Sequence, residues 1–147
     1  MDDALDDHLA SVLAQDLRAV LGKLKRRLRE QAHAEDLTPS QVSVLLRLEK
    51  DGPATASHLA RVEAVRPQSM APVVAALEAL NLVSGAPHPT DGRQTLLSLT
   101  DSCRRRFQES RAARQDWLTR IIQTRLSPQE LDELATAVEL LRRLVDD

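Results

Sequence analysis

The sequence predicts a mainly α-helical protein of the winged helix-turn-helix class, with elements in the order α-α-α-α-β-β-α-α. Three observations lead to this prediction. A short helix, a turn and a second helix follow one another between residues 54 and 80. Two short apolar strands then flank a loop that ends in Asp91-Gly92-Arg93. Long amphipathic segments precede and follow this unit, with apolar residues at the three- and four-residue spacing of a helix.

The composition favours packed helices around an aliphatic core. Of the 147 residues, 42% are hydrophobic, yet only Phe107 and Trp117 are aromatic. A core of Leu, Val and Ala suits helices better than a β-sandwich. The length fits one domain, which we assign to residues 1–147. Cys103 is the only cysteine and the four histidines are scattered, so neither a disulfide nor a metal site is predicted.

Several functional classes are disfavoured by the sequence. The N-terminus is acidic, unlike a signal peptide, and no apolar run reaches membrane-spanning length. We therefore expect a cytoplasmic protein without a membrane partner. The chain shows no nucleophile–base pairing, phosphate-cradling glycine loop or metal-ligand cluster, so we predict neither an enzyme nor a bound cofactor.

The first and last helices carry more apolar surface than a small winged unit can cover. The first is predicted over residues 5–32, and the last begins at the capping box Ser127-Pro128-Gln129-Glu130. We predict that their apolar faces form the interface of a homodimer, with packing within one chain as the alternative. The residues assigned to this interface are Leu9, Leu13, Leu17, Leu134, Leu141 and Leu144.

Capping signals set the helix boundaries between these two ends. Thr38-Pro39-Ser40-Gln41 is a capping box that starts the second helix, which stops at Asp51-Gly52-Pro53. Thr55 is predicted to cap the short third helix, with Val62 on its inward face. Thr100 is predicted to cap the helix that follows the strands.

The fourth helix, predicted from Pro67 to Leu80, is the candidate recognition helix. Its outward face begins with Gln68 and Ser69, and Arg66 precedes it. Amide and hydroxyl side chains can bond base edges or phosphates in the major groove. The predicted inward stripe consists of Met70, Val73, Val74, Leu77 and Leu80.

Pro72 is the unusual residue of this helix. If the helix starts at Pro67, Pro72 occupies the sixth position, where it removes a backbone hydrogen bond. If Ser69 caps the helix instead, Pro72 falls in the first turn, where its missing N–H costs nothing. We expect a frayed or kinked first turn.

The loop between the two strands is predicted to be a wing. The strands begin at Leu82 and Gln94, and the loop from Ala86 to Arg93 is too long for a two-residue hairpin. His88 is a candidate phosphate donor within it.

Charge is unevenly distributed around a net value of −2. In residues 54–99, three arginines balance three acidic residues, whereas every charged residue of 17–29 is basic. Residues 54–99, the part expected to contact bases, are therefore neutral overall, which weakens the case for DNA binding. Base contacts nevertheless supply specificity, and flanking helices can supply affinity for phosphates.

Several strings together resemble the MarR (multiple antibiotic resistance regulator) family. These strings are Leu37-Thr38-Pro39-Ser40-Gln41, Arg66-Pro67-Gln68-Ser69-Met70, Leu77-Glu78, Leu82-Val83, Pro89-Thr90-Asp91-Gly92-Arg93 and Leu99-Thr100. The resemblance implies a homodimeric regulator, usually a repressor, that binds a pseudo-palindromic double-stranded operator. It also implies release by a small, often aromatic or anionic effector. It places the minor-groove contact on Arg93, a steadying role on Asp91, and major-groove contacts on Gln68 and Ser69.

This resemblance implies a division of labour along the chain. Residues 38–100 are assigned to DNA binding, and residues 1–34 and 101–147 to dimerisation. Ala71-Pro72 and Ser84-Gly85-Ala86 depart from the polar or basic residues that family members often carry, which reduces phosphate contacts. The alternative function is therefore a dimer that does not bind DNA and acts as a ligand- or protein-binding module.

Two residues have competing interpretations. Cys103 opens the fifth helix beside Arg104-Arg105-Arg106, an arrangement that can lower a thiol pKa, so a thiol sensor is the alternative to a structural residue. We favour the structural role. Trp117 is interpreted as core or dimer packing, with a ligand platform as the alternative.

Overall fold

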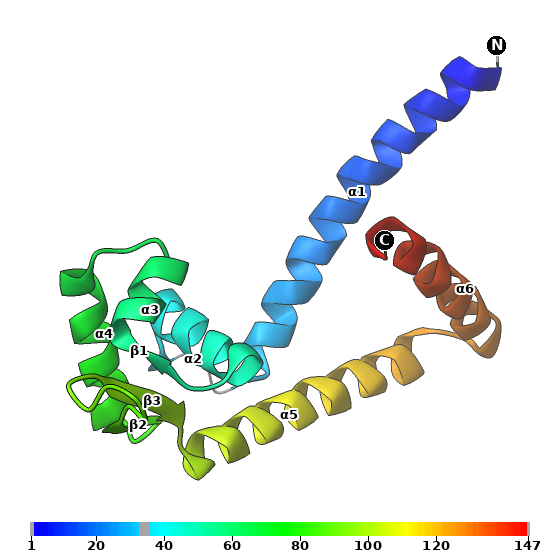
Figure 1. Cartoon of the computed structure of the whole chain (residues 1–147). Helices are drawn as coiled ribbons and strands as arrows, with labels where there is room; N and C mark the ends of the chain where they lie inside the picture. The colour runs from blue at the N-terminus through cyan, green and yellow to red at the C-terminus, as the bar shows by residue number, and fades with distance from the viewer. Residues whose placement is uncertain (1, 33–35, 147) are drawn as a thin grey trace. The chain divides into compact units, whose positions relative to one another are not determined.

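The computed structural model describes residues 2–32 and 36–146 and confirms a mainly helical chain with a small antiparallel sheet (Figure 1). Its helices are α1 (Asp2–Glu30), α2 (Pro39–Asp51), α3 (Ala56–Val62), α4 (Pro67–Ala79), α5 (Asp101–Arg125) and α6 (Pro128–Val145). Its strands are β1 (Ala54–Thr55), β2 (Val83–Pro87) and β3 (Thr95–Leu99). No helix within the described residues combines the length and apolar character needed to cross a membrane.

The chain divides into two compact units. Residues 33–111 form one, here called the winged unit, and residues 1–32 with 112–147 form the other, called the helical unit. The division falls inside α5, later than the predicted boundary at residue 100, because Cys103 and Phe107 pack against the core of the winged unit. Residues 33–35, which include the predicted boundary at residue 34, lie outside the described residues.

The sheet contains a strand that was not predicted. Its order is β1-β3-β2, with both neighbours antiparallel to β3, so Leu97 pairs with Ala54 on one side and with Gly85 on the other. At two residues, β1 is too short to show the alternation that marks a strand in sequence. Gly85 lies close to β3, since a Cβ there would approach Thr95 Cγ2 to 2.6 Å.

The core of the winged unit is aliphatic and joins every element around the sheet. Leu45 of α2, Leu59 of α3 and Leu77 of α4 are essentially inaccessible, with at most 1% of each exposed. The remaining buried members are Val44, Leu48, Ala60, Met70, Val74, Leu82, Val83, Leu97, Leu99 and Cys103. Because α2, α3 and α4 all contribute to one core, this core fixes their mutual orientation.

The predicted caps are confirmed. Thr38 and Gln41 form the reciprocal hydrogen bonds of a capping box at the start of α2, and Ser127 and Glu130 do the same at α6. Thr55 accepts from the His58 N–H, and Thr100 accepts from the Cys103 N–H. Each bond satisfies a backbone donor that the first turn of a helix leaves unpaired.

The helical unit leaves much of its apolar surface exposed in the single chain. Leu9 and Leu13 of α1 are 55% and 58% exposed, and Leu144 of α6 is 72% exposed. Leu17, Leu134 and Leu141 are half-buried. Other exposed apolar side chains of these two helices are Leu5, Val12, Val20, Leu21, Leu131, Val138, Leu140 and Val145.

Candidate nucleic-acid interface

A tight turn joins α3 to α4. Glu63 caps α3, and Ala64 follows with a left-handed φ of 55°. The Ala64 N–H bonds the Arg61 carbonyl at 3.1 Å, and the Val65 N–H bonds the Ala60 carbonyl at 2.9 Å. These two bonds form a Schellman motif, which usually has glycine at the left-handed position. Val62 lies on the surface here, 37% exposed, and is not inward as predicted, because α3 ends at this residue and the chain turns.

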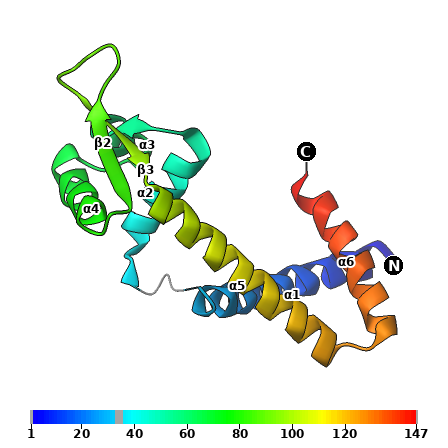
Figure 2. The same ribbon diagram turned by 90° about the horizontal axis from the view of Figure 1, so that it is seen from below.

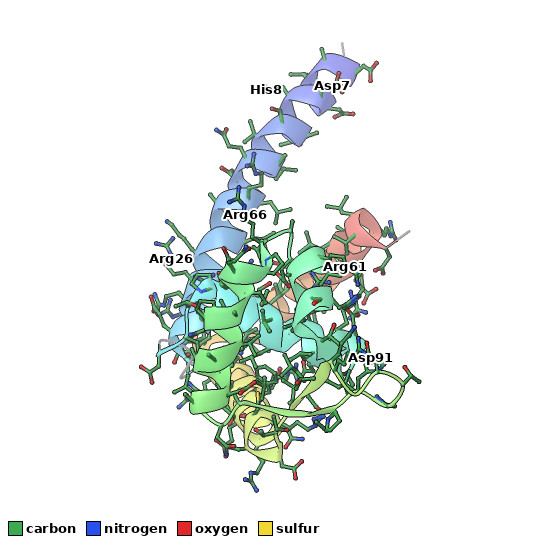
Figure 3. All side chains as sticks on the ribbon, turned by 60° about the vertical axis from the view of Figure 1, so that its left-hand side comes forward. Asp7, His8, Arg26, Arg61, Arg66 and Asp91 are labelled. Carbon is green, nitrogen blue, oxygen red and sulfur yellow. The ribbon has the colours of Figure 1, made fainter. Side chains whose placement is uncertain are left out.

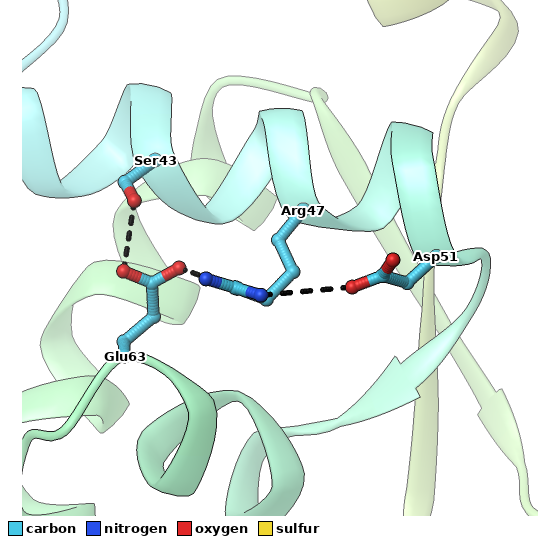
Figure 4. A network of polar contacts seen from close by, with 4 residues as sticks. All are labelled: Ser43, Arg47, Asp51 and Glu63. Carbon is cyan, nitrogen blue, oxygen red and sulfur yellow. Dashed lines mark hydrogen bonds and ion pairs between the residues drawn. The ribbon is translucent and has the colours of Figure 1, made fainter. Parts of the chain in front are cut away.

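A polar clamp holds this turn against α2 (Figure 4). The Glu63 carboxylate accepts from Ser43 Oγ at 2.8 Å and from Arg47 Nε at 2.8 Å. Arg47 also lies 3.6 Å from Asp51. The hydrogen bond from Arg47 is the main cause that lowers the pKa of Glu63, against the opposing effect of partial burial. The clamp ties the end of α3, and with it the start of α4, to α2.

The clamp was not predicted from the sequence. Ser43 and Arg47 are four residues apart and therefore share one face of α2. In the sequence, the clamp was indicated only by this polar pair on a helix whose other side is buried. Its partner, Glu63, lies 16 residues beyond Arg47, and spacing alone does not reveal such a distant contact.

Helix α4 begins at Pro67, so the alternative in which Ser69 caps the helix is wrong. Arg66 is the N-cap residue, but its side chain makes no capping bond. The carbonyl of Arg66 accepts from the N–H groups of both Ser69 and Met70, at 2.9 and 3.1 Å, so the first turn is closed and the expected fraying is wrong. Pro72 lies inside the helix, at its sixth position.

The two faces of α4 differ as predicted, with one exception. Met70, Val74 and Leu77 are buried, and Val73 is half-buried. Leu80, however, is 51% exposed, because it is the C-cap residue and lies beyond the last helical turn. The opposite face presents exposed side chains, which are Arg66, Gln68, Ser69, Ala71, Pro72 and Ala75.

The wing is a seven-residue loop, 88–94, between β2 and β3 (Figure 2). His88 organises its tip, since His88 Nδ1 accepts from the backbone N–H groups of Thr90 and Asp91, each at 3.2 Å. The His88 N–H donates to the Gln94 carbonyl at 3.0 Å and closes the loop. With Nδ1 acting as an acceptor, the ring proton of a neutral His88 belongs on Nε2.

Asp91 supports the other side of the wing. Its Oδ1 accepts from the Arg93 N–H at 3.2 Å, and its Oδ2 accepts from Gln94 Nε2 at 3.4 Å. These bonds hold the backbone that carries the exposed Arg93 side chain. Figure 3 shows Asp91 on this loop, Arg66 at the start of α4 and Arg61 on α3.

The clamp changes the charge balance of the winged unit. Within residues 54–99 the acidic residues appeared to neutralise the arginines, but Glu63 is paired with Arg47, which comes from α2 outside that range. The Asp91 carboxylate is engaged by the wing's own backbone. Of the three acidic residues in 54–99, Glu63 is therefore balanced by an arginine from outside that range, while Asp91 and the exposed Glu78 keep their charges.

Cys103 does not have the low pKa that a thiol sensor needs. Only 1% of this residue is exposed, and burial raises the pKa of its thiol, outweighing the opposing effects of Arg106 and Arg104. A buried thiol with a raised pKa is a poor nucleophile. This burial favours the structural interpretation over the thiol-sensor alternative.

Trp117 packs within the helical unit. It is half-buried, and the guanidinium of Arg27 lies 5.8 Å from the centre of its ring. A cation over an aromatic ring at this distance is attractive. The indole therefore makes an intramolecular contact within this unit.

Comparison with known proteins establishes the family. The family model of the MarR family matches residues 37–95, which run from the start of α2 through α3, α4, β2 and the wing to the first residue of β3. The chain is 40% identical over 135 residues to the HTH-type transcriptional regulator MT0903.1 of Mycobacterium tuberculosis, covering 92% of this chain and 94% of that protein. The chain belongs to the MarR family.

Two further proteins extend the comparison. The HTH-type transcriptional repressor MdtR of Bacillus subtilis is 30% identical over 116 residues, covering 79% of this chain and 75% of MdtR. A MepR variant from S. aureus, solved bound to an oligodeoxyribonucleotide, has a TM-score of 0.71 at 19% identity, covering 89% of this chain and 96% of that one. This chain is therefore a MarR-family helix-turn-helix transcription regulator and not an enzyme.

Proposed function

We propose that the protein is a homodimeric repressor that binds a pseudo-palindromic DNA operator in the cytoplasm and is released by a small effector. The observation that carries this proposal is the pairing of an exposed Gln68-Ser69 surface on α4 with a preorganised wing that presents Arg93. A helix that offers amide and hydroxyl groups suits the major groove. An arginine on a wing suits the negative potential of a narrow minor groove.

The remaining site residues have supporting parts in this proposal. In this proposal Arg66, at the start of α4, and His88, through its Nε2–H, donate to phosphates. Asp91 acts on the wing backbone and not on DNA, because both of its carboxylate oxygens accept bonds from within the wing. Phosphate contacts position the protein, while Gln68 and Ser69 read base edges.

The homodimer is supported by the exposed apolar faces of α1 and α6. Leu9, Leu13 and Leu144 are each more than half exposed in the single chain, which costs free energy unless a partner covers them. A second copy supplies a self-complementary surface. The repressor role is supported by the likeness to the repressor MdtR.

An anionic effector has a candidate site in the winged unit. A hollow of about 260 Å³ lies between the end of α2, β3 and the first turns of α5. Leu48 and Leu99 supply apolar walls, and Arg104 and Arg111 supply positive charge. Arg111 is paired with Glu49 of α2, so an anionic effector would compete with that carboxylate. Such competition would weaken the ion pair that joins α2 to α5.

The proposal is tested by binding of the full chain to the promoter of its own gene across a salt series. We expect Gln68→Ala to cost about 1–3 kcal/mol on the operator and little on random DNA. Arg93→Ala should weaken both and flatten the logarithmic salt slope by about 0.9 per winged unit. Arg142→Ala, on α6, is the matched control and should leave both unchanged.

A dimer that does not bind DNA is the second candidate. It is favoured by the small side chains of Ala71 and Pro72 on the outer face of α4, which offer no charge to phosphates. Binding that is absent, or that does not weaken as salt rises, would decide for this alternative.

A further inference from the structure

Pro72 changes the hydrogen bonding of the exposed face of α4. In an α-helix the N–H of residue 72 would bond the carbonyl oxygen of residue 68. Proline has no N–H, so the Gln68 carbonyl lacks this donor although α4 is helical on both sides of it. The proline ring also crowds that carbonyl and disfavours its alignment with the helix axis.

This acceptor lies on the side of α4 that faces away from the core. Gln68 and Pro72 are exposed, whereas Met70, Val74 and Leu77 are buried. The next side chains on the exposed face, Ala71 and Ala75, extend no further than Cβ. Beyond Gln68 this part of the exposed face therefore carries only two methyl groups and the Pro72 ring, with no long side chain among them.

A carbonyl oxygen accepts hydrogen bonds and never donates them, which makes it selective among bases. In the major groove adenine offers its N6 amine and cytosine its N4 amine as donors. Guanine and thymine offer acceptors there, with only a methyl group in addition on thymine. A carbonyl held at a base edge thus favours A or C over G or T on the strand that it contacts.

We propose that the Gln68 carbonyl oxygen, freed by Pro72, is a base-reading group that selects an exocyclic amine at one position of each half-site. This inference rests on the proposed function, because it needs α4 in the major groove. It assigns Pro72 a role in specificity that its own side chain chemistry does not suggest. The Gln68 side chain contacts bases independently of this carbonyl, because its amide group can both donate and accept hydrogen bonds.

The test uses the full chain and a duplex that the chain itself selects from a random-sequence library. Each adenine or cytosine of the half-site is replaced in turn by an analogue that lacks the exocyclic amine. For the wild-type chain we expect amine removal to weaken binding about tenfold at the position that the carbonyl contacts, in addition to any adenine that the Gln68 side chain contacts. Pro72→Ala restores an N–H to the Gln68 carbonyl, so the loss at that position should disappear.

Two variants provide the controls. Pro67→Ala removes the proline at the first helical position, where an added N–H has no carbonyl of α4 to bond, so it should keep the wild-type profile. Gln68→Ala removes the side chain but keeps the carbonyl, so the amine effect should persist. Thermal melting verifies that each variant is folded.

The outcomes separate this inference from the proposed function. If the wild-type chain selects no duplex, the proposed function fails and this inference fails with it. If the chain binds its duplex but the amine-removal profiles of wild type and Pro72→Ala are the same, only this inference is overturned. A profile that changes with Gln68→Ala and not with Pro72→Ala would assign the amine contact to the side chain instead.

Discussion

Ala64 is the residue at which local strain is clearest. It takes the left-handed conformation of the turn between α3 and α4, with φ of 55°, which a side chain disfavours by about 1 kcal/mol or more. Asn81, at φ of 57°, takes the same conformation after α4, where its Leu82 neighbour bonds the Leu77 carbonyl at 2.9 Å. Asparagine tolerates this region better than alanine.

Replacing Ala64 by glycine should therefore stabilise the protein. We expect Ala64→Gly to raise the free energy of unfolding by about 0.5–1 kcal/mol, after allowing for the greater freedom of glycine in the unfolded chain. Urea unfolding followed by circular dichroism measures the change. Ala75→Gly, in a helix interior, is the control and should destabilise by about 1 kcal/mol. A loss of stability in Ala64→Gly would contradict the account of this turn.

His88 provides the second test at this scale. An asparagine Oδ1 can accept from the N–H groups two and three residues ahead, as His88 Nδ1 does for Thr90 and Asp91. We expect His88→Asn to keep these two amides protected from hydrogen exchange and His88→Ala to expose both. Equal protection in the two variants would show that the Nδ1 acceptor does not hold the wing.

At the scale of elements, the clamp of Ser43, Arg47 and Glu63 joins α2 to the end of α3. The pKa of Glu63 is lowered in the folded protein, mainly by the hydrogen bond from Arg47. A carboxylate with a lowered folded pKa contributes stability that is complete above its unfolded pKa, about 4.3 for glutamate. That contribution is lost as the pH falls through the folded pKa.

Removing the charge should reproduce this loss at neutral pH. We expect Glu63→Gln to lower the free energy of unfolding by about 1 kcal/mol at pH 7. The difference from wild type should shrink as the pH falls below the titration range of a free glutamate. Unfolding curves at a series of pH values measure it, with Glu109→Gln, an exposed residue of α5, as control. A difference that grows toward acid would contradict the assigned sign.

The helices were predictable because their signals are local. The capping boxes at Thr38 and Ser127, and the apolar spacing in α2 and α4, lie within a few residues of the features that they specify. Strand β1 and the clamp were not predictable in this way. Both depend on partners far along the chain, Leu97 for Ala54 and Arg47 for Glu63, and local spacing carries no information about such pairs.

For the candidate site, the sequence predicted which residues are exposed more fully than it predicted the hydrogen bonds among them. The exposed positions of Gln68, Ser69 and Arg93 follow from helix periodicity and loop placement. The hydrogen bonds that His88 Nδ1 accepts inside the wing do not follow from the sequence, because they depend on the backbone geometry of the loop. Likewise the pKa of the Cys103 thiol is raised because the thiol is buried. The neighbouring arginines in the sequence suggested a lowered pKa instead.

At the scale of the whole molecule, the exposed leucines of α1 and α6 are the observation on which the proposed homodimer rests. We expect sedimentation of the wild-type chain at micromolar concentration to show a dimer. Leu13→Asp and Leu141→Asp should dissociate it or prevent folding, because each forces a carboxylate into an apolar interface. Asp132→Ala, at an exposed polar position of α6, is the control. A compact wild-type monomer would contradict the proposed interface.

The central claim is that two winged units, related by a two-fold axis, hold one operator together. Their half-sites should then lie about one helical turn, roughly 10 bp, apart. Inserting about 5 bp between the half-sites turns one of them to the opposite face of the duplex. The decisive measurement compares the affinity of the dimer for the selected operator with and without this insertion. We expect the insertion to reduce binding toward that of a single half-site, whereas unchanged affinity would contradict simultaneous use of both winged units.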